Sequence, residues 1–440
     1  MTGWLPLVLA APLVALLMIA CLREPLRVGL PIYTALIPFG GALSLGSSAF
    51  GSASSLMGVL LGLGLIVQFI TGRQFAPRLS ALLPIWTLFL GLAVATALWS
   101  IDRSASLTGL TVLSSLVVVF LLVALSASDR EIVRRTETAL ILGSAAAICY
   151  GLYQLLFQGG LAGDTGAAIA EGGRFGNGLL GPNILAVTLL IPFAITVNRA
   201  FNPRDPGRPL PNSLLAGLML LGVLMTGSRT GVLGAGAVAL TMVCVMPRGT
   251  RRGLTVSLLI GAAVTVFVWT AHPLGLAERT FESTTSSSGR VDIWEVGLAG
   301  CREYCGIGSG WGTFPDVYAE TQAAVPGARV LAGQEGSYQP HNLALLAAVE
   351  TGVAGLVLLL LGLAASAYYA WKLPPEYRPA ALGALIGLVV GVLLLSSMEF
   401  KMFWLVPTLI SLYRNAVLAE QAAAQEGGVG PPASRPATSL

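Results

Sequence analysis

Three arginines of this chain stand in settings that suit the binding of an anionic group. Arg174, Arg229 and Arg290 are flanked by small residues, in the segments EGG-R-FG, TGS-R-TG and SSSG-R-VD. Glycine lets the backbone approach a ligand closely, and a guanidinium presents its N–H donors in a fork that matches two phosphate oxygens. The pattern predicts a clamp for a phosphate-bearing ligand. The alternative is that these arginines only reach lipid phosphates at a membrane surface.

A histidine is the best candidate for proton transfer. His341 is one of two histidines and stands in the segment QPHNLALL. The imidazole titrates near neutral pH, so it can accept the proton of a sugar hydroxyl and activate the oxygen as a nucleophile. The same segment has a structural interpretation, in which His341 or Asn342 caps the helix that follows. Both interpretations are open at this point.

The sequence offers little support for a metal ion. Asp292 and Glu295 are three residues apart and can share a helix face, but no Asp-x-Asp pair accompanies them. An arginine clamp already supplies positive charge where negative charge develops on a leaving group. We therefore expect neither a metal nor another cofactor. Cys301 and Cys305 lie four residues apart, and the spacing leaves open whether they form a disulfide.

Composition places these residues in a membrane protein. The chain is 55% hydrophobic and only 10% charged, whereas soluble domains are about 25% charged. Runs of about 20 apolar residues, each long enough to cross a bilayer, recur along the chain. The N-terminal run has no basic segment before it, so we expect a first span and not a cleaved signal peptide. The basic residues are dispersed among short loops, which disfavours nucleic acid as a partner.

The apolar runs predict an all-α polytopic membrane protein with about 12–13 transmembrane helices. The count is uncertain by one because the second run contains two prolines and the last run is short. The expected spans are 4–22, 28–45, 54–71, 81–100, 106–127, 138–157, 183–200, 212–228, 231–246, 253–271, 343–370, 380–399 and 402–414.

The basic residues predict the orientation. Most of the 25 lysines and arginines fall in one set of short connections, and short arginine-rich loops belong in the cytoplasm. The long polar stretch from Pro273 to Pro340 then faces outward, as do the loops that carry Arg174 and Arg229. The expected parts are transmembrane helices 1–10 in 1–272, an outer loop with the candidate site in 273–342, C-terminal transmembrane helices in 343–414, and a disordered cytoplasmic tail in 415–440.

The order of several motifs resembles a known family. WSID follows an early span, RFGNGLLGPNILA enters a later one, and TGSRTG joins two spans. SGRVDIWEVGL, GIGSGWGTF and PHNLALLAAVETGVAGL follow in the outer stretch and the next helix. This series resembles the O-antigen ligase and O-antigen polymerase superfamily of bacterial inner-membrane enzymes, over about residues 95–370.

The resemblance implies a GT-C-like fold and a glycan donor linked to undecaprenyl diphosphate, without metal or nucleotide sugar. It implies that Arg229 and Arg290 engage the diphosphate and that His341 is the base. Arg174 matches the arginine of an arginine–asparagine element of the family that ends at Asn183, although a GLLG insert separates the two here. Arg174, Asn183 and Asn342 are therefore candidate substrate-binding residues. The active site is expected on the periplasmic face.

The resemblance implies three alternative functions, and a fourth alternative belongs to another class of protein. A ligase transfers the glycan to an acceptor such as the lipid A core of lipopolysaccharide, and we favour this reading. A polymerase joins lipid-linked repeat units by the same chemistry, and a pilin-glycosylating enzyme is a weaker third reading. A transporter or flippase of lipid-linked sugars is a rival of another class, but it is expected to carry ionisable residues deep in several spans. Here the spans are nearly free of charge, with Glu350 as the main exception.

Overall fold

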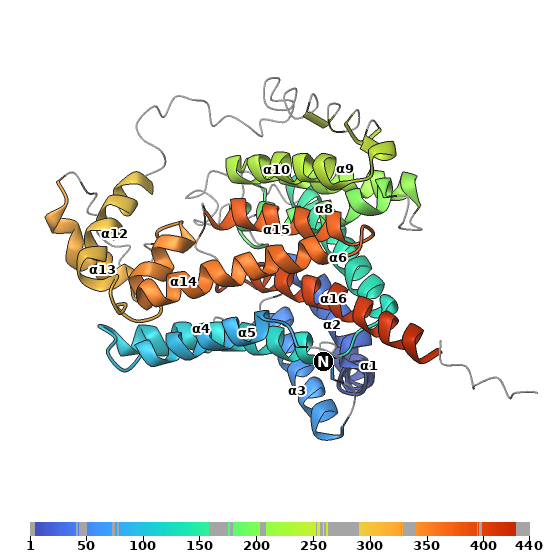
Figure 1. Ribbon diagram of the computed structural model, residues 1–440, viewed down its shortest axis with the longest axis horizontal. Coiled ribbons are helices and arrows are strands. Elements are labelled where there is room, and N and C mark those ends of the chain that lie inside the picture. Colours follow the sequence, from blue (N-terminus) through green and yellow to red (C-terminus); the bar gives the residue numbers. More distant parts are fainter. Residues whose placement is uncertain are drawn as a thin grey trace, which may run out of the picture.

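The computed structural model describes most of the chain as helix (Figure 1). The described residues are 5–40, 43, 51–72, 75–76, 79–157, 175–176, 179–202, 208–251, 253–255, 258, 261–262, 290–326, 328, 339–393, 395 and 398–427. Within them the only extended pairing is an isolated bridge between Phe75 and Ser126. The all-α class is therefore confirmed.

The helices follow the expected apolar runs closely. They are α1 (Leu5–Arg23), α2 (Leu30–Leu36), α3 (Ala53–Ile70), α4 (Leu82–Thr96), α5 (Arg103–Leu125), α6 (Arg130–Phe157), α8 (Pro182–Phe201), α9 (Pro209–Met225), α10 (Arg229–Val245), α12 (Arg290–Tyr304), α13 (Phe314–Thr321), α14 (Leu343–Lys372), α15 (Arg378–Val392) and α16 (Lys401–Gly427). Short turns of other helix types occur at Pro25–Gly29, Ile37–Phe39 and Gln322–Ala324.

Several of these helices can cross a membrane. Five described helices are long and apolar enough, namely Ala53–Ile70, Arg103–Leu125, Pro182–Phe201, Leu343–Lys372 and Lys401–Gln425. The shorter apolar helices are Leu82–Thr96, Pro209–Met225, Arg229–Val245 and Arg378–Val392. The protein is thus a multi-pass membrane protein. The count of 12–13 spans stays a prediction, and most of the expected span 253–271 lies outside the described residues.

Several helix boundaries differ from the expectation. α2 ends at Leu36, before the expected 45, and α15 ends at Val392, before the expected 399. α6 begins at Arg130, before the apolar run, because Asp129 accepts a hydrogen bond from the backbone N–H of Ile132 and caps a polar first turn. α16 continues to Gly427 and so extends into the range 415–440 that the sequence assigned to a disordered tail. The Ala/Glu/Gln-rich residues there are good helix formers, and Ala416 is buried. Residues 428–440 lie outside the described part.

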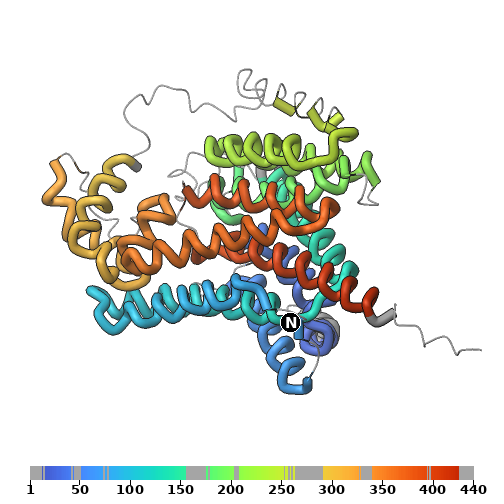
Figure 2. Tube along the Cα trace, viewed as in Figure 1, coloured from blue at the N-terminus to red at the C-terminus, as the bar shows by residue number. Residues whose placement is uncertain are grey.

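α8 is the central helix of the bundle. Its residues from Leu185 to Asn198 are all buried, and it contacts α6, α9, α10 and α15. α12 and α13 lie at one end of the bundle, while α16 leaves it at the other (Figure 2). The first residues of α5 and α14 lie at the same end as α12 and α13.

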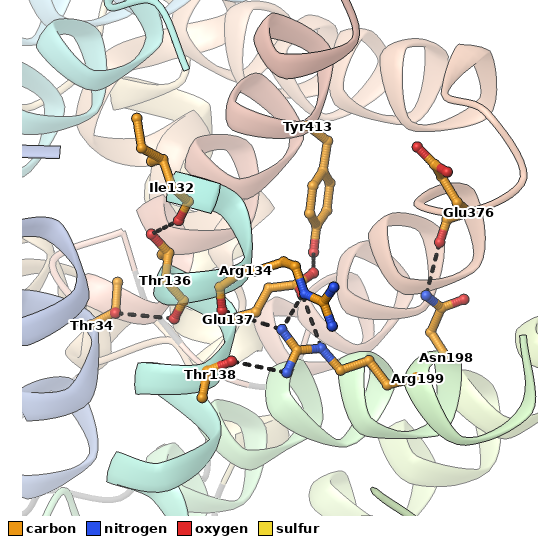
Figure 3. A network of polar contacts seen from close by, with 10 residues as sticks. All are labelled: Thr34, Ile132, Arg134, Thr136, Glu137, Thr138, Asn198, Arg199, Glu376 and Tyr413. Carbon is orange, nitrogen blue, oxygen red and sulfur yellow. Dashed lines mark hydrogen bonds and ion pairs between the residues drawn. The ribbon is translucent and has the colours of Figure 1, made fainter. Parts of the chain in front are cut away.

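A network of polar contacts joins α6, α8 and α16 at the opposite end (Figure 3). The Arg199 guanidinium donates to Glu137 with an Nη2–Oε2 distance of 2.6 Å, and both side chains are nearly buried. Tyr413 donates its hydroxyl to the other oxygen of Glu137 at 2.5 Å. Asn198 donates its amide to the Glu376 carbonyl at 2.9 Å. Because the charges are paired and hydrogen-bonded, the contact is tolerated in an otherwise apolar bundle.

Candidate functional site

The turn that follows α12, Gly306–Thr313, is a scaffold for the site and is called the glycine loop below. Gly308, Gly310 and Gly312 all have positive φ values, of 89°, 117° and 85°. Residues with a side chain rarely adopt this backbone conformation. In addition, a Cβ on Gly308 would stand 2.4 Å from the Glu350 carbonyl oxygen. The GIGSGWGT motif is therefore explained by backbone geometry and close approach to α14.

The glycine loop replaces backbone hydrogen bonds that α14 lacks. Gly352 interrupts α14 with φ 70° and ψ −176°. The carbonyls of Val349 and Glu350 then accept hydrogen bonds from the loop, from Ser309 N at 2.9 Å and Gly310 N at 3.1 Å. In the other direction the Val353 N–H donates to Cys305 O at 2.8 Å. The loop and the broken helix therefore complete each other's hydrogen bonding.

Glu350 anchors the next helix. Its side chain is buried, and its Oε1 atom accepts a hydrogen bond from the Phe314 N–H at 3.1 Å. Phe314 is the first residue of α13, whose N-terminal N–H groups have no partner within the helix. The sequence marked Glu350 only as an unusual charge in a span. Its function in the structure is to hold the glycine loop and α13 against α14.

The WSID motif is also structural. The Trp99 indole donates to Gly308 O at 3.1 Å, and the Ile101 N–H donates to Ser309 O at 3.0 Å. Asp102 accepts hydrogen bonds from two N–H groups in the first turn of α5. The Trp311 ring packs edge-on against Phe89 of α4, with ring centroids 5.9 Å apart. These contacts fix the glycine loop between α4, α5 and α14.

His341 is held at the start of α14 in an unusual backbone conformation. Its φ value is 46°, the left-handed region that residues other than glycine seldom occupy. On one side, Pro340 O accepts a hydrogen bond from the Trp294 indole at 2.6 Å. On the other, Asn342 caps α14 by accepting from the Leu345 N–H at 3.1 Å. Asn342 is therefore the helix cap, and His341 is presented by residues fixed on both sides.

The same contacts bring α12 to His341. Trp294 stands one helical turn after Arg290, the first described residue of α12. Its indole binds the carbonyl of the residue before His341. The start of α12 and the start of α14 are therefore neighbours, as the sequence hypothesis requires. The Arg290 side chain itself lies outside the described part.

Arg229 and Asn183 form a second pair of neighbouring helix starts. Arg229 is the first residue of α10 and is exposed, while Ser228 before it is buried and accepts from the Gly231 N–H at 3.2 Å. A Cβ on Gly231 would stand 2.6 Å from the Ala186 Cβ, so the two helices touch there. Half-buried Asn183 lies in the first turn of α8, one turn before this contact.

Arg174 lies outside the described residues, but the segment that follows it is partly described. Gly176 has φ 107°, and its carbonyl accepts hydrogen bonds from the N–H groups of Leu179 at 3.0 Å and Gly181 at 3.2 Å. Leu179 is buried. Residues 179–181, the described part of the GLLG insert, therefore belong to a turn that leads directly into α8.

Glu320 and the two cysteines of α12 and the residue after it have structural partners. Tyr304 donates its hydroxyl to Glu320 at 2.7 Å, and this hydrogen bond is the main reason that the pKa of Tyr304 is raised to about 12. Cys301 and Cys305 form a disulfide, with their Cα atoms 4.5 Å apart, at the end of α12. Among the described residues no group of three His, Cys, Asp or Glu side chains is arranged to hold a metal ion. Metal independence stays a prediction.

Comparison with known proteins agrees with the motif order. Residues 214–360 match the family model described as O-antigen ligase. The matched range contains Arg229, Arg290, His341 and Glu350, and it ends within α14. Arg174 and Asn183 precede it. No curated protein matches the chain at a significant level.

Proposed function

We propose that the protein transfers a glycan from undecaprenyl diphosphate to a sugar hydroxyl of an acceptor. The proposal starts from the match of residues 214–360 to the O-antigen ligase family model. The favoured acceptor is the lipid A core of lipopolysaccharide. The reaction takes place at the periplasmic face of the bacterial inner membrane. The observation that carries the proposal is the left-handed His341, held beside the start of α12 by the Trp294–Pro340 hydrogen bond.

The proposed reaction is a single displacement at the anomeric carbon. His341 removes the proton of the acceptor hydroxyl, and the oxygen forms a bond to the anomeric carbon from the face opposite the leaving group. The bond from that carbon to the diphosphate oxygen breaks, and undecaprenyl diphosphate leaves with the electron pair. Arg229 and Arg290 stabilise the negative charge that develops on it. The anomeric configuration is inverted.

The roles of base and clamp are separated by measuring donor affinity and turnover in nanodiscs. Arg229→Ala and Arg290→Lys should lower turnover by about 10²–10³ and weaken donor binding, because neither variant retains a forked donor. His341→Ala should lower turnover by about 10²–10⁴ with nearly unchanged donor affinity. Arg302→Ala is the matched control, since Arg302 is exposed in the last turn of α12. Normal turnover of His341→Ala would reduce that residue to a structural role.

Metal removal tests the supply of positive charge. If the arginines neutralise the diphosphate, activity should survive excess EDTA. A loss that added magnesium or manganese restores would instead favour Asp292 and Glu295 as ligands.

The acceptor is identified in a deletion strain by polysaccharide gel. Loss of a ligase leaves polymer on the carrier lipid and none on lipid A. Loss of a polymerase leaves lipid A with a single repeat unit, and that outcome would replace the ligase assignment.

A further inference from the structure

A small cavity between the first turns of α3, α8 and α16 has no part in the mechanism above. Its volume is about 60 Å³, enough for a few water molecules or one small polar group. Part of its wall is apolar and includes Leu180, Ile184 and Met402. Its polar lining consists of Ser54, Thr188, Glu399 and Lys401.

The lysine stands in an electrostatically unfavourable position. Lys401 is the first residue of α16, and its ammonium donates to the Ser55 hydroxyl at 3.0 Å. Ser55 lies in the first turn of α3. The ammonium is therefore held between the N-terminal turns of two helices, where the helix dipoles favour anions and disfavour cations.

No carboxylate among the described residues forms a direct ion pair with this ammonium. Glu399 lines the same cavity, yet it is exposed and forms no ion pair with Lys401. At the opposite end of the bundle, the nearly buried Arg199 has Glu137 at 2.6 Å. A charge near the apolar region that lacks a counter-ion is costly and commonly faces a substrate. Within the described part, the Lys401 ammonium therefore has a hydroxyl partner but no direct counter-ion.

The cavity is lined by residues close in sequence to two candidate substrate-binding residues. Ile184 follows Asn183 in the first turn of α8, and Leu180 belongs to the turn that follows Arg174. The Thr188 hydroxyl donates to the Met402 sulfur at 3.3 Å, which holds α8 against α16. A cation beside apolar walls suits a phosphate attached to a hydrocarbon chain. Resting on the proposed function, we infer that Lys401 binds a phosphate of the lipid-linked donor in this cavity.

The test is the affinity of the full-length protein for undecaprenyl diphosphate in nanodiscs of neutral lipid. Lys401→Met should weaken binding about 10- to 100-fold, the usual range for the loss of one charge-assisted hydrogen bond. Lys401→Arg, which keeps a cation, should restore most of the affinity. Lys372→Met is the matched control, because Lys372 is the last residue of α14 and its ammonium lies over the Tyr368 ring, 5.7 Å from the ring centroid. Should Lys401→Met not fold, Lys401→Gln retains a donor for Ser55 and carries the same test.

The outcomes separate the two proposals. If the wild type binds undecaprenyl diphosphate and the Lys401 variants bind it equally well, Lys401 does not hold the donor. That result overturns the inference and leaves the proposed function standing. If the wild-type protein neither binds the lipid nor transfers a glycan, both fail. A repeat in nanodiscs with anionic phospholipid identifies the source of the phosphate. If Lys401→Met weakens the binding of anionic phospholipid as much as it weakens the binding of undecaprenyl diphosphate, the cavity is a site for bulk lipid. That result would overturn the donor role.

Discussion

The ion pair between Arg199 and Glu137 gives a residue-scale prediction about stability. The two side chains are only 10% and 7% exposed, so removal of one partner leaves a charge that water cannot reach. Arg199→Met should lower the free energy of unfolding by about 3–5 kcal/mol. Arg135→Met, which breaks an exposed pair with Glu131 on the same helix α6, should cost no more than about 0.5 kcal/mol. Unfolding in detergent micelles measures both.

A double variant tests the reason for the loss. Replacing Arg199 and Glu137 together with apolar residues removes both charges, so most of the stability should return. If the double variant loses as much free energy of unfolding as the two single variants together, the two residues do not act as a unit. The unpaired charge is then not the cause of the loss.

At this scale the sequence identified residue types better than it identified roles. The glycine and serine neighbours of Arg229 drew attention to it, and the structure shows that Ser228 caps α10 and Gly231 contacts α8. The sequence left open whether Asn342 is a helix cap, and its oxygen does cap α14, whereas its contact with substrate stays a prediction. The role of Glu350 could not be predicted, because its partner Phe314 is distant in sequence.

Glycines in the glycine loop provide a prediction at the scale of elements. Gly308→Ala should lower glycan transfer at least tenfold, because a Cβ there meets the Glu350 carbonyl oxygen at 2.4 Å and the positive φ costs about 1–2 kcal/mol. Gly306→Ala is the matched control, since a Cβ at that position meets nothing within 4 Å. Transfer rates and amounts in the membrane should be compared for both. Equal activity of the two variants would show that the close approach of loop and helix is not required.

The disulfide at the end of α12 gives a second prediction at this scale. Protein purified without reductant and then unfolded should react with a thiol reagent at Cys21, Cys149 and Cys244 only. After reduction, all five cysteines should react. Cys305→Ser should make every remaining cysteine reactive without reduction. Mass spectrometry counts the labels, and five labels before reduction would contradict the bond.

Helices were predictable as elements, whereas the contacts between them were not. Apolar runs located most helix ends within a few residues, because burial in lipid requires continuous hydrophobic segments. The start of α6 and the end of α16 lie in polar helical turns, and hydropathy does not detect such turns. The break at Gly352 depends on partners in a loop some forty residues earlier in the chain, so no local pattern indicates it.

At the scale of the whole molecule, orientation is open to direct measurement. The distribution of basic residues predicts that the stretch 273–340 faces the periplasm and that Thr250 faces the cytoplasm. In a chain without native cysteines, cysteines at Ser287 and Gln334 should react with an impermeant thiol reagent in intact cells. A cysteine at Thr250 should react only after the cells are opened. Labelling of position 250 in intact cells would show that the orientation is the opposite of the predicted one. The proposed location of the active site would then be wrong.

The mutual dependence of the glycine loop and α14 has a consequence for biogenesis. Thr96 and Trp99 are synthesised early, yet their side chains bind backbone groups of Trp311 and Gly308. Their loop neighbours Ser309 and Gly310 in turn donate hydrogen bonds to the carbonyls of Val349 and Glu350. A ribosome must therefore release residues up to about 353 before this end of the molecule can close. Until then this end of the early spans lacks its hydrogen-bond partners, so we expect a chain truncated before α14 to leave the glycine loop unclosed.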